Sequence, residues 1–276
     1  MKKNNKKITI IITLYKTPTK KIYKLNQYKN FENIIFNQES NKFFKKIIKK
    51  KIGFEFRYYS SKKNIGLSKA SNFLLNKVNT KYCLFTQADI IIDEKAINQL
   101  AEILLKSRDV IFIAPNFNYN KKNKIQEYKY VKKLDIACIL CDVQKLKKIG
   151  FFDEDFFLYW EDIYLIDKIK KSNYKMIFAN NIKAIHDSSK STEDTLNIKF
   201  IRNTNFKYGE LLYDYKTTKL RFLKIFRQFF QNLLFFIINI LLFKRKQLLN
   251  NLANMLGIVK FLKFILMKKV FSLINL

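Results

Sequence analysis

The first 115 residues alternate short apolar runs with segments of helical periodicity. The apolar runs, which we expect to be strands, are residues 8–14, 32–37, 54–59, 81–86 and 110–115. The helical patterns between them are residues 20–28, 42–51, 66–78 and 94–105. This alternation predicts an α/β fold with a parallel, doubly wound sheet. In such a sheet ligands bind beyond the carboxyl ends of the strands, so functional residues are expected there.

Polar residues follow the predicted strands at those ends. They are Tyr15, Asn37, Glu39, Asn64, Gly66 and Asp89. Neither a G-x-G-x-x-G nor a G-x-x-x-x-G-K-[ST] motif is present, so the sequence supports neither a dinucleotide-binding fold nor a P-loop NTPase. Taken alone, an aspartate at a strand end is better explained as the cap of the next turn than as a functional residue.

A second group of acids lies in "GFFDEDFFLYWED", residues 150–162. A helical pattern from about residue 161 to 171, an apolar run at 174–179 and the single histidine, His186, follow it. Acids at a helix start commonly stabilise the helix, by about 0.3–1 kcal/mol. The same position predicts that Asp162 stays ionised with a low pKa, because the helix macrodipole favours negative charge there. On its own, His186 is explained equally by a hydrogen bond to backbone at a strand end.

Together these motifs resemble family 2 glycosyltransferases of the GT-A fold, whose hallmark is "GFDExFFxYxEDxDL" followed by a helix, a strand and a histidine. The similarity covers about residues 7–190 and includes "NIG" after the third strand and "AD" after the fourth. It implies a mostly parallel central sheet in a transferase domain of residues 1–190, followed by a helical extension of residues 191–276. The implied activity is an inverting, metal-dependent transfer of a sugar from a nucleotide-diphosphate sugar to a hydroxyl.

The resemblance also implies roles for individual residues. Asp162 matches the catalytic base, with Glu161 beside it. Asp89 matches the metal-binding aspartate of a DXD-type motif, and His186 matches a histidine that completes the metal site in some members. The expected cofactor is Mg²⁺ or Mn²⁺, which suits carboxylate and phosphate oxygens with an imidazole. The remaining expected nucleotide-sugar contacts are Tyr15, Asn37, Glu39, Asn64 and Gly66.

The sequence departs from the family pattern at several positions. Leu14 and Lys16 replace the Thr and Asn of the usual Thr-Tyr-Asn, and Asn37 stands where an Asp usually contacts the nucleotide base. Tyr164 replaces the last Asp of "EDxD". The retained residues suffice for the chemistry, because inverting transfer needs one base for the acceptor hydroxyl and neutralisation of the leaving diphosphate.

Two further residues are expected on the acceptor side, Asp153 and Trp160. Trp160 suits stacking on an acceptor sugar and packing in the core equally well. Asp153 and the next two acids, Glu154 and Asp155, are explained either as acceptor-side residues or as ordinary loop acids.

Charge points to an anionic partner. Lys+Arg is 54 and Asp+Glu is 22, which gives a formal net charge of +32. Only six of the basic residues are arginine, and they are scattered, so specific nucleic-acid binding is not expected. An AT-rich coding bias also accounts for the lysine excess. The three cysteines form no disulfide pattern, which favours a reducing compartment; Cys138 and Cys141 are expected in a buried strand.

The C-terminal region differs in composition. Residues 200–219 resemble the tail of the rhamnosyltransferase-like branch, which implies rhamnose or another deoxyhexose. The apolar core Phe229–Phe243 has 15 residues, fewer than the roughly 20 that span a bilayer. Lysines interrupt the final apolar stretch. We expect two basic amphipathic helices in the headgroup region of an anionic membrane, with a short span or plain core helices as alternatives.

The expected enzyme is cytoplasmic and peripheral on the inner face of the cell membrane, and it acts on a lipid-linked or surface glycan of cell-wall or lipopolysaccharide biosynthesis. The rival hypothesis is a basic membrane- or nucleic-acid-binding protein whose transferase site has decayed.

Overall fold

The computed structural model describes residues 8–39, 42–117, 127–187, 192, 195–218 and 221–274. The chain forms two compact units. The first, here called the sheet unit, contains residues 1–154 and 162–193. The second, the helical unit, contains residues 155–161 and 194–276. The short segment 155–161 therefore groups with helices that come much later in the chain.

The sheet unit is built on one large mixed sheet in the order β3-β2-β1-β4-β8-β6-β9-β7, and β5 pairs with β10 in a separate small sheet. The strands are β1 Ile8–Leu14, β2 Glu32–Asn37, β3 Arg57–Ser60, β4 Tyr82–Thr86, β5 Ile90–Ile91, β6 Val110–Asn116, β7 Lys129–Val131, β8 Ile139–Asp142, β9 Lys175–Lys183 and β10 Ile185–His186. Four of the neighbouring pairs in the large sheet are parallel and three are antiparallel. The prediction of an α/β fold with a mostly parallel sheet is confirmed.

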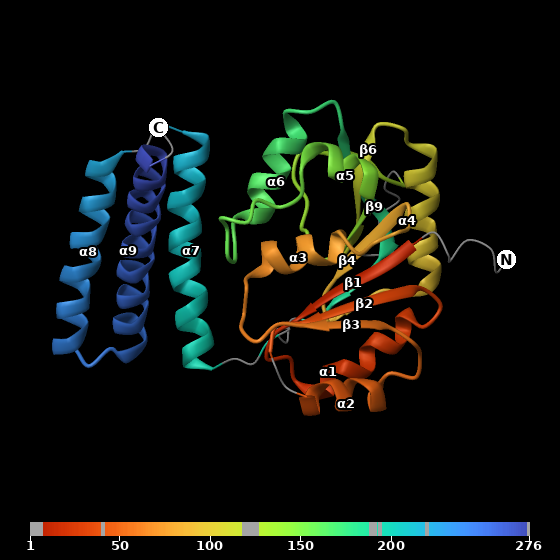
Figure 1. Cartoon of the computed structure of the whole chain (residues 1–276), viewed down its shortest axis with the longest axis horizontal. Coiled ribbons are helices and arrows are strands. Elements are labelled where there is room, and N and C mark those ends of the chain that lie inside the picture. Colours follow the sequence, from red (N-terminus) through yellow and green to blue (C-terminus); the bar gives the residue numbers. More distant parts are fainter. Residues whose placement is uncertain are drawn as a thin grey trace. The chain divides into compact units, whose positions relative to one another are not determined.

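Helices cover both faces of the large sheet (Figure 1). They are α1 Thr19–Ile22, the 3₁₀ helix η2 Tyr23–Tyr28, α2 Lys42–Lys51, α3 Leu67–Leu75, α4 Glu94–Lys106, α5 Val143–Ile149 and α6 Glu161–Lys170. One core layer joins α1, η2, α2 and α4 to the sheet, and the other joins α3, α5 and α6. β1 shows the alternation behind these layers, since Ile10 and Ile12 lie in the first and Ile11 in the second.

Two details differ from the sequence prediction. β8 runs antiparallel between β4 and β6, and it comes from residues 139–142, beyond the first 115 residues from which the parallel arrangement was predicted. The strand expected at 54–59 begins only at Arg57, because Phe54 and Phe56 pack against the core without joining the ladder. The expectation for the cysteines is confirmed in part: Cys141 is buried in β8, whereas Cys138 is buried in the bend just before this strand.

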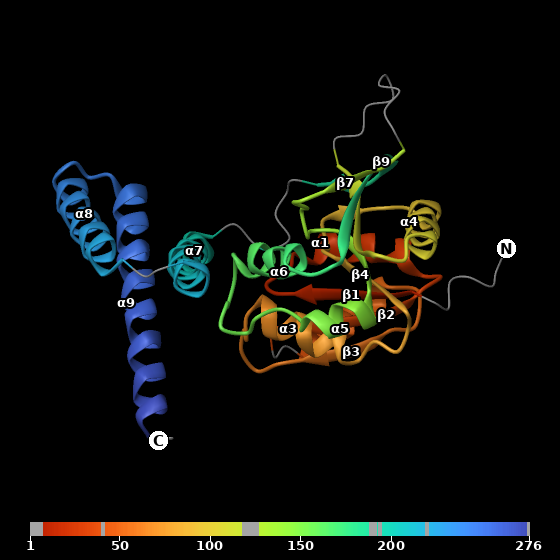
Figure 2. The ribbon, with the colours of Figure 1, turned by 90° about the horizontal axis from the view of Figure 1, so that it is seen from above.

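The helical unit contains three long helices, α7 Leu196–Thr217, α8 Phe222–Leu241 and α9 Arg245–Ile274. α9 packs against both α7 and α8, and Figures 1 and 2 show it beside each of them. Its buried side chains are Ala253, Ile258, Phe261 and Ile265. Among the described residues, one helical segment, Arg245–Lys268 of α9, is long and apolar enough to cross a membrane by length and composition.

Candidate active site

The first group of predicted site residues lies where β1 and β2 end side by side. Leu14 and Asn37 are paired across the two strands. The backbone N–H of Lys16, a residue with φ of 45°, donates to Glu39 Oε2 at 3.2 Å. Asn37 is fully buried, and its Nδ2 donates to the Glu39 carbonyl at 2.9 Å. Tyr15, between these strand ends, is half-buried. Asn37 and Glu39 therefore shape this strand edge.

The loop after β3 joins the same edge. Gly66 has φ of 90°, a conformation that favours glycine, and it directly precedes α3. Its N–H donates to Asn64 Oδ1 at 2.9 Å. The N–H of Ile65 donates to Gln38 Oε1 at 3.0 Å, which ties this loop to the end of β2. Gln38 was missed by sequence reasoning, although it stands directly after Asn37 at a strand end.

Asp89 and His186 are brought together by the small sheet. His186 pairs with Ile90 across β10 and β5, and the N–H of Asp187 donates to the Asp89 carbonyl at 2.9 Å. His186 Nε2 lies 3.6 Å from Asp89 Oδ2. The Asp89 side chain is 2% exposed and that of His186 is 38% exposed. The two residues therefore form one polar site that opens to solvent on the histidine side.

The Asp89–His186 pair fits a divalent cation. Asp89 Oδ1 is buried and has no hydrogen-bond partner among the described residues, so it is available as a ligand. An imidazole nitrogen and a carboxylate suit Mn²⁺, and Mg²⁺ accepts the carboxylate. No group of three or more His, Cys, Asp or Glu side chains suited to a metal occurs in the described part of the chain. The cation would therefore take its other ligands from water or substrate oxygens.

Sequence reasoning missed the basic residues beside this pair. Lys24 forms an ion pair with Asp187. Lys21 is buried, and burial lowers its pKa against the opposing effect of the Asp89 and Asp187 carboxylates. These lysines bring positive charge to the position where a metal-bound diphosphate is expected. The adjacency of Asp187 to His186 was the available signal, but nothing in the sequence pairs it with Lys24.

Asp162 lies in the first turn of α6, as predicted, but its pKa is shifted upward and not downward as expected. Burial raises the pKa of Asp162, although hydrogen bonds from backbone N–H groups act in the opposite direction. One of these bonds runs from the Ile163 N–H to Asp162 Oδ1 at 2.8 Å. The helix start favours the charge, as expected, and the loss of hydration outweighs it. Glu161, beside it, is 5% exposed.

Two residues in left-handed conformations lead into α6. Tyr159 has φ of 68° and Trp160 has φ of 70°, which is unusual for large side chains. Such conformations persist where the surroundings hold them, and they concentrate at functional sites. The Trp160 ring packs against Phe206 and Tyr213 of α7 within the helical unit, with centroid separations of 5.7 and 5.3 Å. The core-packing alternative for Trp160 is therefore the one with structural support.

The three acids before this turn have separate surroundings. Glu154 Oε1 accepts from Asn72 Nδ2 at 3.0 Å, within the sheet unit. Asp155, in the helical unit, pairs with Lys216 at 2.7 Å and with Lys268 at 3.3 Å. Burial alone would raise the pKa of Asp155, but these lysines lower it. Asp153 is half-buried. Of the three acids, Asp155 therefore has a structural role, because its ion pairs connect it to α7 and α9.

The chain is similar to a known protein family. A sequence profile of glycosyl transferase family 2 matches residues 20–165, more than half of the 276 residues. No curated protein sequence matches the chain.

Two solved structures are similar in fold. The mannosyltransferase PcManGT from Pyrobaculum calidifontis, in complex with GDP-Man and Mn²⁺, aligns with a TM-score of 0.59 at 13% identity over 80% of this chain and 67% of that chain. S. aureus TarS in complex with UDP-GlcNAc aligns with a TM-score of 0.50 at 13% identity over 74% of this chain and 66% of that chain. The alignments thus span about two thirds of each solved chain. At this identity they show the fold alone.

Proposed function

The chain belongs to glycosyl transferase family 2 and is a glycosyltransferase, and from that premise we propose that it transfers a sugar, with inversion, from a nucleotide-diphosphate donor to a glycan hydroxyl. The observation that carries the proposal is the Asp89–His186 pair, with a buried carboxylate oxygen left over for a cation. A second carboxylate, Asp162, supplies the base.

Asp162 removes the proton of the acceptor hydroxyl as that oxygen attacks the anomeric carbon. The bond from this carbon to the diphosphate oxygen breaks, and the nucleoside diphosphate leaves with the bonding electrons. Because burial raises the pKa of Asp162, its carboxylate is a stronger base than an aspartate in water.

The donor diphosphate needs positive charge near its leaving oxygen. Asp89 and His186 would hold a divalent cation, which when bound supplies that charge. Lys21 and Lys24 add positive charge from the segment after β1. The strand-end residues Tyr15, Asn37 and Glu39 lie at the edge of the sheet where the nucleotide is expected to bind.

The donor sugar and the acceptor are the finer part of the proposal. The resemblance of residues 200–219 to the rhamnosyltransferase-like tail makes a deoxyhexose such as rhamnose the first donor sugar to test. The apolar, basic helices α8 and α9 support a lipid-linked acceptor at the cytoplasmic face of the cell membrane.

The test compares two substitutions in the full chain. Asp162→Asn is expected to lower kcat for transfer by about 10²–10⁴-fold, because it removes the base, and to leave donor binding unchanged. Asp89→Ala is expected to abolish the rise in melting temperature that Mn²⁺ and the donor together produce. A panel of nucleotide sugars identifies the donor.

A specific result would contradict each of these assignments. Equal transfer rates in Asp162→Asn and the parent would remove Asp162 as the base, and full donor protection in Asp89→Ala would remove Asp89 as the metal ligand. If no donor binds while RNA or DNA binds with a steep salt dependence, the basic binding protein with a decayed site is the correct interpretation.

A further inference from the structure

Helix α8 carries apolar side chains on the face that it turns outward as well as on the face that it turns inward. The side chains that it turns inward include three amides, Gln228, Asn232 and Asn239. Asn232 Oδ1 accepts from Asn254 Nδ2 of α9 at 3.0 Å, and Asn239 is 8% exposed. Ile225 also faces inward, at 2% exposed, and most of the exposed side chains on the opposite face are apolar, although Lys224, Arg227 and Gln231 are exposed there as well. Soluble bundles place apolar side chains inside and polar ones outside, so the surroundings of α8 are not simply water.

The outward apolar residues follow one another at intervals of three and four along α8. This outer stripe consists of Leu223, Phe226, Phe230, Leu234, Ile237 and Leu241. Each of its members is 49% or more exposed, and Leu223 is 87% exposed. At 1.5 Å per residue the stripe is about 27 Å long. An exposed apolar surface of this length marks an interaction site.

Basic residues stand at both ends of the outer stripe. Arg221, Lys224 and Arg227 lie at its start, and residues 244–246, "KRK", follow its end. Two copies of α8 laid face to face would bring basic ends together in either orientation, which disfavours a second copy of this chain. An anionic lipid surface is complementary to the apolar stripe and to both basic ends.

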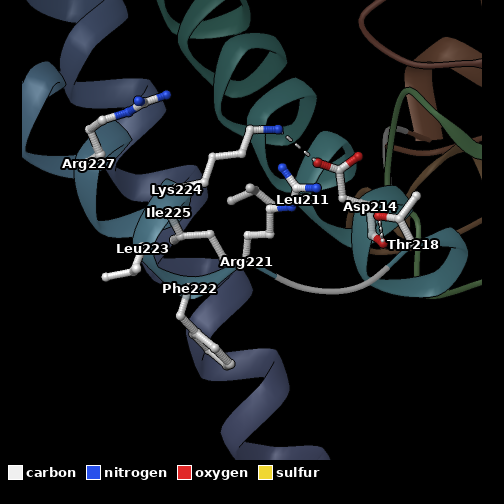
Figure 3. A pocket seen from close by; sticks show the side chains of 9 residues that line it. All are labelled: Leu211, Asp214, Thr218, Arg221, Phe222, Leu223, Lys224, Ile225 and Arg227. Carbon is white, nitrogen blue, oxygen red and sulfur yellow. Dashed lines mark hydrogen bonds and ion pairs between the residues drawn. The ribbon is translucent and has the colours of Figure 1, made fainter.

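A cavity of about 880 Å³ lies at the start of the stripe, between the end of α7 and the beginning of α8 (Figure 3). Its lining combines basic and apolar residues, namely Leu211, Asp214, Thr218, Arg221, Phe222, Leu223, Lys224, Ile225 and Arg227. Asp214 pairs with Lys224 at 3.3 Å, as Figure 3 shows. No ion pair of Arg221 or Arg227 occurs in the described part of the chain. The cavity therefore offers two guanidinium groups beside apolar walls.

We propose that the outer stripe of α8 lies in the interfacial region of an anionic bilayer and that the cavity at its start binds the phosphate of a lipid headgroup. Guanidinium groups bind phosphate oxygens bidentately, and the apolar walls suit the first part of a lipid chain. Two of the six arginines of the chain line this cavity, so the lysine-rich composition does not explain them. The inference rests on the proposed function only in taking a lipid-linked acceptor as the reason for membrane contact.

Vesicle co-sedimentation of the full-length protein tests the stripe. The parent is expected to bind phosphatidylglycerol-containing vesicles and not pure phosphatidylcholine vesicles. Leu234→Asp should weaken binding on the order of tenfold or more, because it removes buried apolar area and adds a like charge. Leu105→Asp in α4 is the matched control and should behave as the parent, since Leu105 is 58% exposed and Leu234 is 57% exposed.

Removing positive charges from the cavity and measuring vesicle binding tests its role. Arg221→Gln with Arg227→Gln should weaken binding more than Lys106→Gln with Arg108→Gln, which removes two exposed charges from the sheet unit. Equal losses in the two double variants would show a net-charge effect and overturn the cavity assignment. Millimolar inorganic phosphate that raises the melting temperature of the parent and displaces the vesicles would reassign the cavity to free phosphate.

Three other results would overturn the proposal for the stripe. The first is equal vesicle binding by Leu234→Asp and Leu105→Asp. The second is a parent protein that does not bind vesicles but forms a dimer, which Leu234→Asp dissociates. The third is vesicle-bound protein that resists extraction by alkaline carbonate, as a membrane-spanning helix does. Vesicle binding needs no donor, and transfer is measured in parallel on a soluble acceptor. Failure of the membrane proposal and failure of the transferase proposal are therefore separate results.

Discussion

At the scale of single residues, Asp162 is a site where function and stability conflict. Its carboxylate is half-buried, and burial raises its pKa, so ionising it in the folded protein costs more than ionising it in the unfolded chain. Asp162→Asn removes this cost while keeping the size of the side chain. We expect the variant, despite its lower kcat, to unfold at a higher temperature than the parent at neutral pH.

The pH dependence of that difference follows from the direction of the shift. Below the usual pKa of 3.8, Asp162 is protonated in both the folded and the unfolded chain. As pH rises above this value, the unfolded chain releases the proton first, so the folded state loses relative stability until its own pKa is passed. The gain in melting temperature from Asp162→Asn should therefore be larger at pH 7 than at pH 4. A gain independent of pH would contradict a raised pKa.

The site was partly predictable from the sequence, and the limits have physical causes. The strand-end rule predicts where Asp89 lies, and the family spacing points to His186, which the structure places 3.6 Å from it. The upward direction of the Asp162 pKa shift was not predictable, because the hydration of this carboxylate depends on side chains that come from elsewhere in the chain. The Lys24–Asp187 ion pair joins residues 163 positions apart, and no local pattern carries that information.

At the scale of elements, the packing of α9 on α7 depends on Gly257. A Cβ at this position would lie 2.6 Å from the Thr204 carbonyl oxygen and 2.8 Å from Lys207 Cβ. Backbone cannot move aside as a flexible side chain does, so Gly257→Ala has to separate the helices. We expect it to lower the free energy of unfolding by about 1–3 kcal/mol, measured by urea denaturation.

Gly53→Ala is the matched control for this prediction. Its added Cβ would meet only Asn26 Oδ1, at 3.8 Å, which is an ordinary contact. An unfolding free energy for Gly257→Ala equal to that of Gly53→Ala would show that the two helices are not closely packed at Gly257.

The elements themselves were largely predictable, because their periodicities are local. β1, β2 and α2 begin and end where their apolar patterns do. The direction of β8 was not predictable, since a buried apolar strand has the same sequence character whether its neighbours run parallel or antiparallel to it. The inward amides of α8 likewise follow helical spacing, but the partner that they face, α9, becomes known only from the fold.

At the scale of the whole molecule, the chain passes between its two units at the start of α6. Residues 155–161 belong to the helical unit, and Asp162 is the first residue after them in the sheet unit. The contacts of this segment with α7 and α9 include the Asp155 ion pairs with Lys216 and Lys268, and the hydrogen bond from Tyr208 Oη to the Asp155 carbonyl at 3.1 Å. One peptide bond therefore connects the segment anchored by the helical unit to the proposed base.

Gly209 allows this connection to be tested without touching a catalytic group. A Cβ there would lie 2.9 Å from both Trp160 Cδ1 and the Tyr159 carbonyl oxygen. Gly209→Ala should displace these left-handed residues and, through them, the start of α6. We expect kcat to fall about 10–100-fold, because small misplacements of a catalytic group are costly. Donor affinity should stay unchanged, since the proposed donor-binding residues all lie in the sheet unit.

Steady-state kinetics and donor binding, measured together, distinguish positioning from general destabilisation. A structural defect alone would reduce the amount of folded enzyme and would be seen in the melting temperature, whereas displacement of Asp162 lowers kcat per folded molecule. Gly53→Ala should keep the parent values of both. If Gly209→Ala keeps the parent kcat, the helical unit does not position the base, and its role is restricted to the membrane contact proposed for α8.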